Sequence, residues 1–121
     1  MNASRWIIGC IFIVDWCLLT YLALAPSPGH SGIPHFDKLL HFIAYFQLSA
    51  LAFLLMPNQK LFLRLCALII VYGAVIEFLQ SFVPGREMSV LDFVANTIGV
   101  IFLVWLCKIY LAKKAAGSSV R

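Results

Sequence analysis

Charged side chains are scarce in this sequence. Only 12% of its 121 residues are Asp, Glu, Lys or Arg, whereas 63% are apolar. A soluble domain carries about a quarter of charged residues and about half of apolar ones. A chain of this composition surrounded by water would leave too much apolar surface exposed, so the composition excludes an ordinary soluble domain. It indicates that lipid is the solvent for much of the chain.

Familiar chemical motifs are absent as well. The sequence has no CxxC pair, HExxH, GxSxG, P-loop or dinucleotide fingerprint. Its four cysteines all lie in apolar runs, and its net charge of +4 comes without a basic stripe interleaved with aromatic residues. We therefore predict no metal site, no cofactor and no nucleic-acid partner, and we interpret the cysteines as small buried apolar residues. The positive charge suggests contact with anionic lipid.

Long apolar segments are what the sequence does contain. A membrane-spanning helix needs about 20 mostly apolar residues, and breaks rich in Pro and Gly separate the segments of that length. We predict an all-α integral membrane protein with one domain over residues 1–121, a retained N-terminal helix and a frayed C-terminal tail. The four predicted transmembrane helices cover about 5–25, 38–56, 61–83 and 90–112.

The basic residues are distributed unevenly between the two sides of this predicted bundle. Cytoplasmic loops carry an excess of Lys and Arg. Lys38 and Arg86 fall on one side, and the other side collects seven of the nine basic residues: Arg5, Lys60, Arg64, Lys108, Lys113, Lys114 and Arg121. This asymmetry predicts that the N- and C-termini are cytoplasmic and that the loops 26–37 and 84–89 face outward.

Polar residues lie at matched depths in the third and fourth predicted helices. At 1.5 Å per residue, Glu77 and Asn96 are each about 10 Å below the outer end of their helix. Gln80 and Asp92 are each about 5 Å deep by the same count. Because the two helices are antiparallel neighbours, Glu77 is expected opposite Asn96, and Gln80 opposite Asp92.

The second predicted helix brings further polar groups to this level, because Asp37 and His41 are four residues apart and share a face. Charged groups within a membrane usually face the bundle interior or water. We therefore predict that three helices converge on a polar pocket open to the outer side. Its candidate ligand-binding residues are Asp37, Lys38, His41, Glu77, Gln80, Arg86, Asp92 and Asn96.

Several of these residues also have purely structural interpretations. Ser89 and Asp92 fit a capping box, in which Ser89 caps the fourth helix and Asp92 reaches back to its backbone. Asp37 fits a helix cap or a favourable partner of the helix dipole. Asn96 fits a hydrogen bond between helices. Glu77 is beyond the reach of any cap, and it is the hardest of the set to explain by structure alone.

Two segments resemble a known family. "DKLLHFIAYF" at 37–46 and "IEFLQSFVPGREMSVLDFVANTIG" at 76–99 are similar to the VanZ-like family of small bacterial membrane proteins, which is named for a teicoplanin-resistance protein. The resemblance covers essentially the whole chain, although Leu103 stands where many relatives have a glycine. It implies a multi-pass protein of the bacterial inner membrane, in the cell envelope, that affects sensitivity to teicoplanin-type antibiotics. The matching motif positions are Asp37, Lys38, His41, Glu77, Gln80, Pro84, Gly85, Arg86, Ser89, Asp92, Asn96 and Gly99.

Three functions remain open at this point. The first is binding of an anionic lipid headgroup or a lipid-linked cell-wall precursor, with Arg86 donating two hydrogen bonds to the phosphate. The second is an intramembrane enzyme whose catalytic acid–base groups are His41, Glu77 and Asp92. The third is a proton-coupled transporter or flippase subunit. It rests on Glu77 and on Asp15, about 15 Å deep, and would require a homo-oligomer. Asp15 also fits a hydrogen bond between helices.

Overall fold

Four helices account for most of the chain that the computed structural model describes, residues 3–26 and 35–118. They are α1 (Ala3–Leu24), α2 (Phe36–Leu55), α3 (Gln59–Gln80) and α4 (Val90–Ser118), and these residues contain no strand. All four are long and apolar enough to cross a membrane. At 1.5 Å per residue, α1, α2 and α3 measure about 30 to 33 Å, which matches the hydrocarbon thickness of a bilayer. The predicted all-α fold with four spans is confirmed.

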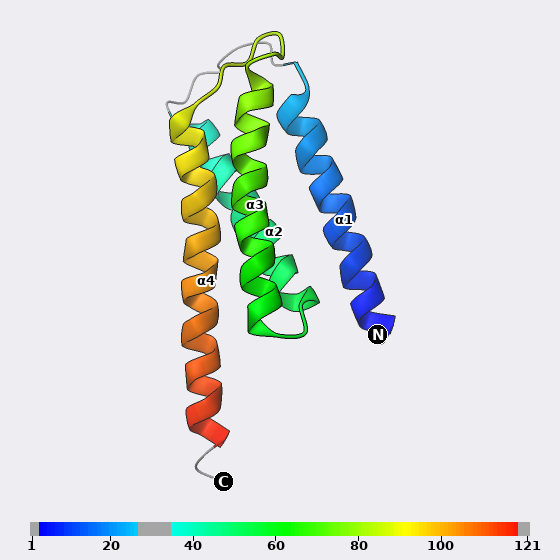
Figure 1. Ribbon diagram of the computed structural model, residues 1–121, viewed down its shortest axis with the longest axis vertical. Coiled ribbons are helices and arrows are strands. Elements are labelled where there is room, and N and C mark those ends of the chain that lie inside the picture. Colours follow the sequence, from blue (N-terminus) through cyan, green and yellow to red (C-terminus); the bar gives the residue numbers. More distant parts are fainter. Residues whose placement is uncertain (1–2, 27–34, 119–121) are drawn as a thin grey trace.

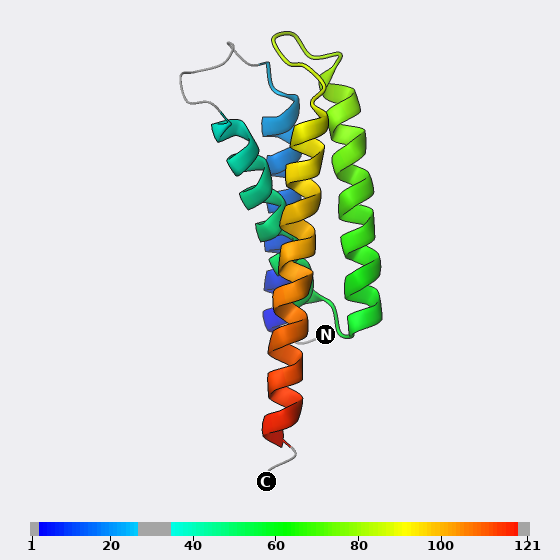
Figure 2. The same cartoon turned by 90° about the vertical axis from the view of Figure 1, so that its left-hand side faces the viewer.

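The helices alternate in direction. α1 and α3 run toward the end of the bundle that carries the 81–89 connection, and α2 and α4 run away from it (Figure 1, Figure 2). We call this end the outer end, following the orientation predicted from the basic residues, which stays a prediction. The N-terminal end of α1 and the C-terminal end of α4 both lie toward the opposite end. Arg121 and residues 27–34 of the predicted 26–37 loop lie outside the described residues.

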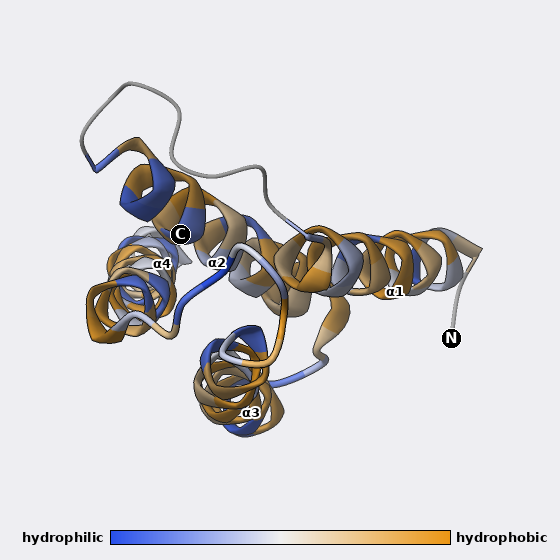
Figure 3. Cartoon of the chain, turned by 90° about the horizontal axis from the view of Figure 1, so that it is seen from above, coloured by the Kyte–Doolittle hydropathy of each residue, from blue (hydrophilic) through white to orange (hydrophobic). Residues whose placement is uncertain are grey.

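α2 is the central helix of the bundle. It contacts all three other helices and packs most extensively on α4, whereas α1 contacts only α2 and α3 within the described residues. Seen from above, α2 lies between α1 and α4, and apolar residues dominate the ribbons of all four helices (Figure 3). Large apolar side chains are exposed on every helix, as expected of surfaces that face lipid. The helices therefore expose apolar residues outward, and α2 is the helix that contacts all of the other three.

Gly99 sets how closely α2 and α4 approach. A Cβ atom added at Gly99 would lie 2.5 Å from the backbone oxygen of Phe42 and 3.1 Å from the backbone nitrogen of Phe46. Small residues allow such backbone contact between membrane helices. Val100 and Leu48, buried next to this crossing, belong to the apolar core. This close contact fixes the second and third turns of α2 against the third turn of α4.

The α3–α4 connection begins earlier than the sequence predicted. α3 ends at Gln80 rather than at 83, because the amides of Ser81, Phe82 and Val83 bond to carbonyls three residues back, which tightens the last turn. Arg86 N–H then donates to Val83 O at 3.1 Å, and Gly85 has φ 75°. Pro84 and Gly85 therefore form a tight turn, with glycine at the position that needs positive φ.

α4 continues beyond its predicted end. The tail was expected to be frayed from about residue 113, but the helix runs to Ser118. Lys113, Lys114, Ala115 and Ala116 are strong helix formers, so the helix persists past the last apolar residues. The expectation of a frayed segment is wrong up to Ser118.

The cysteines divide into two pairs. Cys66 and Cys107 are buried, as predicted, but Cys10 and Cys17 are exposed on α1. α1 has a single buried residue, Phe12, so most of its surface is left to lipid. Burial within the protein was therefore the wrong expectation for the two cysteines of α1.

Candidate functional site

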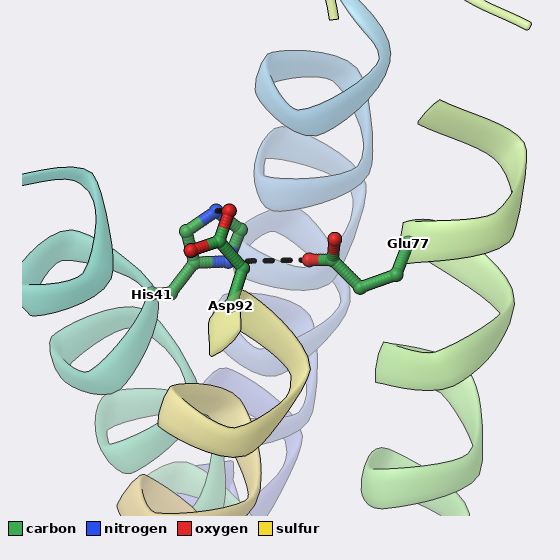
Figure 4. Close-up of side chains that lie close together, drawn as sticks. All are labelled: His41, Glu77 and Asp92. Carbon is green, nitrogen blue, oxygen red and sulfur yellow. Dashed lines mark ion pairs between the residues drawn. The ribbon is translucent and has the colours of Figure 1, made fainter. Parts of the chain in front are cut away.

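His41 lies at the centre of a group of polar side chains from three helices, near the outer end of the bundle (Figure 4). Its Nδ1 is 3.0 Å from Asn96 Oδ1 and 3.7 Å from Glu77 Oε1. Its Nε2 is 3.8 Å from Asp92 Oδ2. The side chain of Glu77 is only 4% exposed and that of Asp92 11% exposed. We call these four residues together with Lys38 the His41 cluster.

Lys38 closes the cluster at its rim. Its Nζ donates to Asp92 Oδ1 at 2.9 Å and to Asp37 Oδ2 at 2.7 Å. The side chains of Lys38 and Asp37 are 24% and 39% exposed, so this edge is the accessible one. An ammonium group has three donors, and two of them are used here. One N–H of Lys38 therefore remains for a further acceptor.

The start of α4 is capped by Ser89 of the preceding connection and by Glu77 of α3. Ser89 Oγ accepts from the Asp92 backbone N–H at 3.2 Å, which confirms the predicted Ser89 cap. The reciprocal bond, however, goes from Ser89 N–H to Glu77 Oε2 of α3, at 3.2 Å. The expectation that Asp92 completes the box is wrong, because Glu77 already occupies the Ser89 N–H. The Asp92 carboxylate is left to face Lys38 and His41.

The hydrogen bond to Asn96 orients the imidazole. Asn96 Oδ1 is an acceptor only, so His41 Nδ1 carries the hydrogen and Nε2 is the nitrogen turned toward Asp92. Two buried polar atoms of the cluster have no hydrogen-bond partner, namely Glu77 Oε1 and Asn96 Nδ2. Such atoms are rare in folded proteins and call for a physical explanation.

The cluster and the neighbouring Asp37 are together short of positive charge. Three carboxylates, those of Asp37, Glu77 and Asp92, surround one ammonium group, that of Lys38. With a neutral imidazole the sum is 1 − 3 = −2, and with a protonated one it is −1. Buried charges are normally compensated. The arrangement can therefore hold a proton, a cationic group or a metal ion.

Three side chains among the described residues lie in an arrangement that could hold a metal ion. His41, Glu77 and Asp92 each offer one ligand atom, and these three atoms all lie within 4.8 Å of one another. No metal-binding spacing along the chain predicts it, because the residues come from α2, α3 and α4. The prediction that the protein holds no metal rested on spacing alone.

Gln80 and Arg86 lie at the end of α1. Gln80 Nε2 donates to Ala23 O at 3.0 Å. Arg86 donates from Nε to Ala25 O at 2.8 Å and from Nη2 to Leu22 O at 2.7 Å. The last carbonyls of a helix have no partner within it, and these side chains supply one. The candidate residues thus divide into the His41 cluster with Asp37, and a pair that holds α1.

The expected pairing across α3 and α4 also changes. Gln80 bonds to α1 and Asp92 to Lys38, so no Gln80–Asp92 rung forms within the described residues. Glu77 and Asn96 do lie at one level, but both approach His41 Nδ1. The His41 side chain of α2 therefore lies between Glu77 and Asn96, which depth counting had paired directly.

Asp15 lies apart from the cluster. Its Oδ1 accepts from Gln47 Nε2 of α2 at 2.8 Å, which confirms the interpretation as a hydrogen bond between helices. Thr20 of α1 and Tyr72 of α3 form another such link, 2.7 Å between their hydroxyl oxygens. Sequence analysis missed Gln47, although a depth count along α2 places it about level with Asp15.

Four helices able to span a membrane, with a cluster of ionisable side chains near one end, define a polytopic membrane protein. The family model described as VanZ/LLP1 matches residues 5–111. The chain belongs to this family, as the resemblance in its motifs predicted. The searches of curated proteins and of solved structures gave no match.

Proposed function

We propose that the protein binds the polar headgroup of an anionic lipid or a lipid-linked cell-wall precursor in the outer leaflet of the bacterial inner membrane. The observation that carries the proposal is the third N–H of Lys38 at the half-exposed rim of a buried polar cluster. A phosphate oxygen approaching this edge finds a charged donor whose position two carboxylates already fix. Charge-assisted hydrogen bonds of this kind are about twice as strong as neutral ones.

The proposal assigns Arg86 a different task from the one expected. Its hydrogen bonds to the carbonyls of Leu22 and Ala25 hold the outer end of α1 beside the site. Lys38 therefore takes the role of hydrogen-bond donor to the phosphate. If the protein binds a lipid-linked precursor at this leaflet, the protein and a teicoplanin-type antibiotic bind the same molecule. This supports an effect of the protein on sensitivity to such antibiotics. Expression of the protein in a sensitive host is expected to change teicoplanin susceptibility.

Lipid retention tests the proposal directly. The wild-type protein and its Lys38→Gln variant are purified under identical mild conditions, and their co-extracted lipids are identified by mass spectrometry. We expect one phosphate-bearing class to be enriched with the wild type and several-fold depleted with Lys38→Gln, because a neutral amide forms a weaker bond to phosphate.

Lys60→Gln is the matched control. Lys60 is an exposed lysine at the start of α3, at the opposite end of the bundle. This variant should retain the wild-type lipids. Identical lipid profiles for all three proteins would remove the support for headgroup binding through Lys38.

An acid–base enzyme is the second candidate, favoured by the placement of His41 between two carboxylates. Asn96 holds Nδ1, which leaves Nε2 to accept or donate a proton next to Asp92. This matches the requirement for an oriented general base. Asp92→Asn is expected to retain the bound lipid but to abolish conversion of a lipid-linked substrate, measured as a mass change in a cell-envelope lipid extract. Asp15→Asn is the control. Equal conversion by both variants would exclude a catalytic role for Asp92, and no conversion by the wild type would exclude the enzyme.

A further inference from the structure

We propose that His41, Glu77 and Asp92 bind one divalent first-row transition-metal ion of the zinc type at the outer end of the bundle. This inference stands apart from headgroup binding, since it uses atoms on the inner side of Lys38. It departs from the expectation, drawn from spacing along the chain, that the protein holds no metal.

The three side chains come close enough to share an ion. One ligand atom from each lies within 4.8 Å of the others. His41 Nε2 is 3.8 Å from Asp92 Oδ2, and Glu77 Oε1 is 3.7 Å from the other ring nitrogen of His41, Nδ1. Ligand atoms of a tetrahedral zinc lie about 3.3 Å apart, so closure takes shifts of roughly 0.5 to 1.5 Å. Small side-chain rotations on three helices supply such shifts.

Each of the three side chains has one atom held by an outer partner. His41 Nδ1 bonds to Asn96, Glu77 Oε2 accepts from Ser89 N–H, and Asp92 Oδ1 accepts from Lys38. This leaves His41 Nε2, Glu77 Oε1 and Asp92 Oδ2. Metal-binding histidines commonly donate their other ring N–H to an oxygen, and metal-binding carboxylates are themselves hydrogen-bonded. The cluster has this outer shell already in place.

An unpartnered buried oxygen supports the same conclusion. Glu77 is 3% exposed, and its Oε1 has no hydrogen-bond partner although it is directed at the imidazole. A metal ion would give this atom a partner. It would also supply two positive charges, which equals the deficit of the cluster and Asp37 taken together when the imidazole is neutral.

The donor set selects the type of ion. One imidazole and two carboxylates suit zinc, manganese or iron, whereas magnesium and calcium prefer oxygen ligands alone. Three protein ligands leave a fourth position open. The exposed rim of Lys38 and Asp37 gives the ion a path from the outer side.

The test uses full-length protein purified in detergent without a polyhistidine tag and stripped of metal. Cobalt(II) is titrated in and read by its visible absorption, which reports ligand number. We expect one cobalt per chain and a higher midpoint of thermal unfolding with zinc than with a chelator. Glu77→Gln and Asp92→Asn should each weaken cobalt binding by at least about 100-fold, since even outer-shell changes cost 10–100-fold.

Asp15→Asn is the matched control, since Asp15 is a partly buried carboxylate in a helix that does not reach the cluster. It should bind cobalt like the wild type. Absence of stoichiometric cobalt binding by the wild type, or equal binding by all variants, would overturn the proposal and leave a proton as the compensating charge. If a variant does not fold, the stoichiometry and unfolding midpoint of the wild type still decide the question.

Discussion

At the scale of single residues, the site depends on side chains that have two polar atoms and use each of them toward a different neighbour. Glu77 caps α4 with one oxygen and approaches His41 with the other. Asp92 bonds to Lys38 with one oxygen and faces His41 with the other. Removing one of these groups therefore affects two neighbours at once. Substitutions that keep one bond while removing the other will separate the structural and functional roles.

Asn96 provides the first prediction. Asn96→Leu keeps most of the side-chain volume but leaves the Nδ1–H of His41 without an acceptor. An unsatisfied buried donor costs about 1–3 kcal/mol, and we expect the free energy of unfolding to fall by that amount. Reversible unfolding in detergent, followed by circular dichroism, measures the change.

Thr97→Val is the control for this experiment. Thr97 Oγ1 bonds only within α4, to Phe93 O at 2.9 Å, and valine has nearly the same shape. Its effect should be well below that of Asn96→Leu. Equal losses for the two variants would mean that the Asn96–His41 bond contributes nothing particular.

At the scale of helices, α1 and α2 are held in different ways. α2 is held by close packing, most tightly where Gly99 of α4 meets the backbone of Phe42. α1 is little buried, and polar bonds fasten it to α2, α3 and the 81–89 connection. The two attachments should therefore respond to different substitutions.

Gly99→Ala tests the packing of α2 on α4. The added methyl group would meet Phe42 O at 2.5 Å, so the helices must separate. Overpacking typically costs about 1–3 kcal/mol, and the thermal unfolding midpoint should fall. Gly117→Ala is the control, because nothing lies within 4 Å of its added Cβ. Alanine favours a helix over glycine, so this variant should be neutral or slightly more stable.

Arg86→Ala tests the attachment of α1. It removes two charge-assisted bonds, to Leu22 O and Ala25 O, each worth about 1.5–3 kcal/mol at most when buried. Hydrogen exchange followed by mass spectrometry should become faster in the last turn of α1 and stay unchanged in α4. Arg64→Ala, on the exposed face of α3, is the control. Unchanged exchange in α1 would show that packing alone holds its end.

The sequence predicted the site better than it predicted the attachments. Depth counting placed Glu77 and Asn96 about 10 Å deep and Asp92 about 5 Å deep in the outer part of the bundle, because rise per residue is uniform in a helix. It did not assign Arg86 and Gln80 to α1, since backbone carbonyls at a helix end leave no mark in sequence. It also paired Ser89 with Asp92 locally, whereas a side chain from α3 took that place. Helix positions follow from local rules, but the choice among competing acceptors depends on tertiary contacts.

At the scale of the whole molecule, orientation is the property that remains a prediction. Seven basic residues on one side against two on the other predict that both termini are cytoplasmic. Single cysteines at Glu87 and Lys114, in a protein without its four native cysteines, test this in intact cells. A membrane-impermeant maleimide should label Glu87→Cys directly and Lys114→Cys only after permeabilisation. The reverse pattern would place the His41 cluster at the cytoplasmic face.

The bonds that hold α1 also impose an order of assembly during synthesis. Gln80 and Arg86 follow their acceptors on α1 by 57 and 61 residues. At about 5–20 residues per second, they are made roughly 3 to 12 s after the end of α1. During this interval the carbonyls of its last turn have only water or lipid headgroups as partners. The outer end of the first helix therefore stays at the membrane surface without these bonds until the third helix and the turn after it have been synthesised.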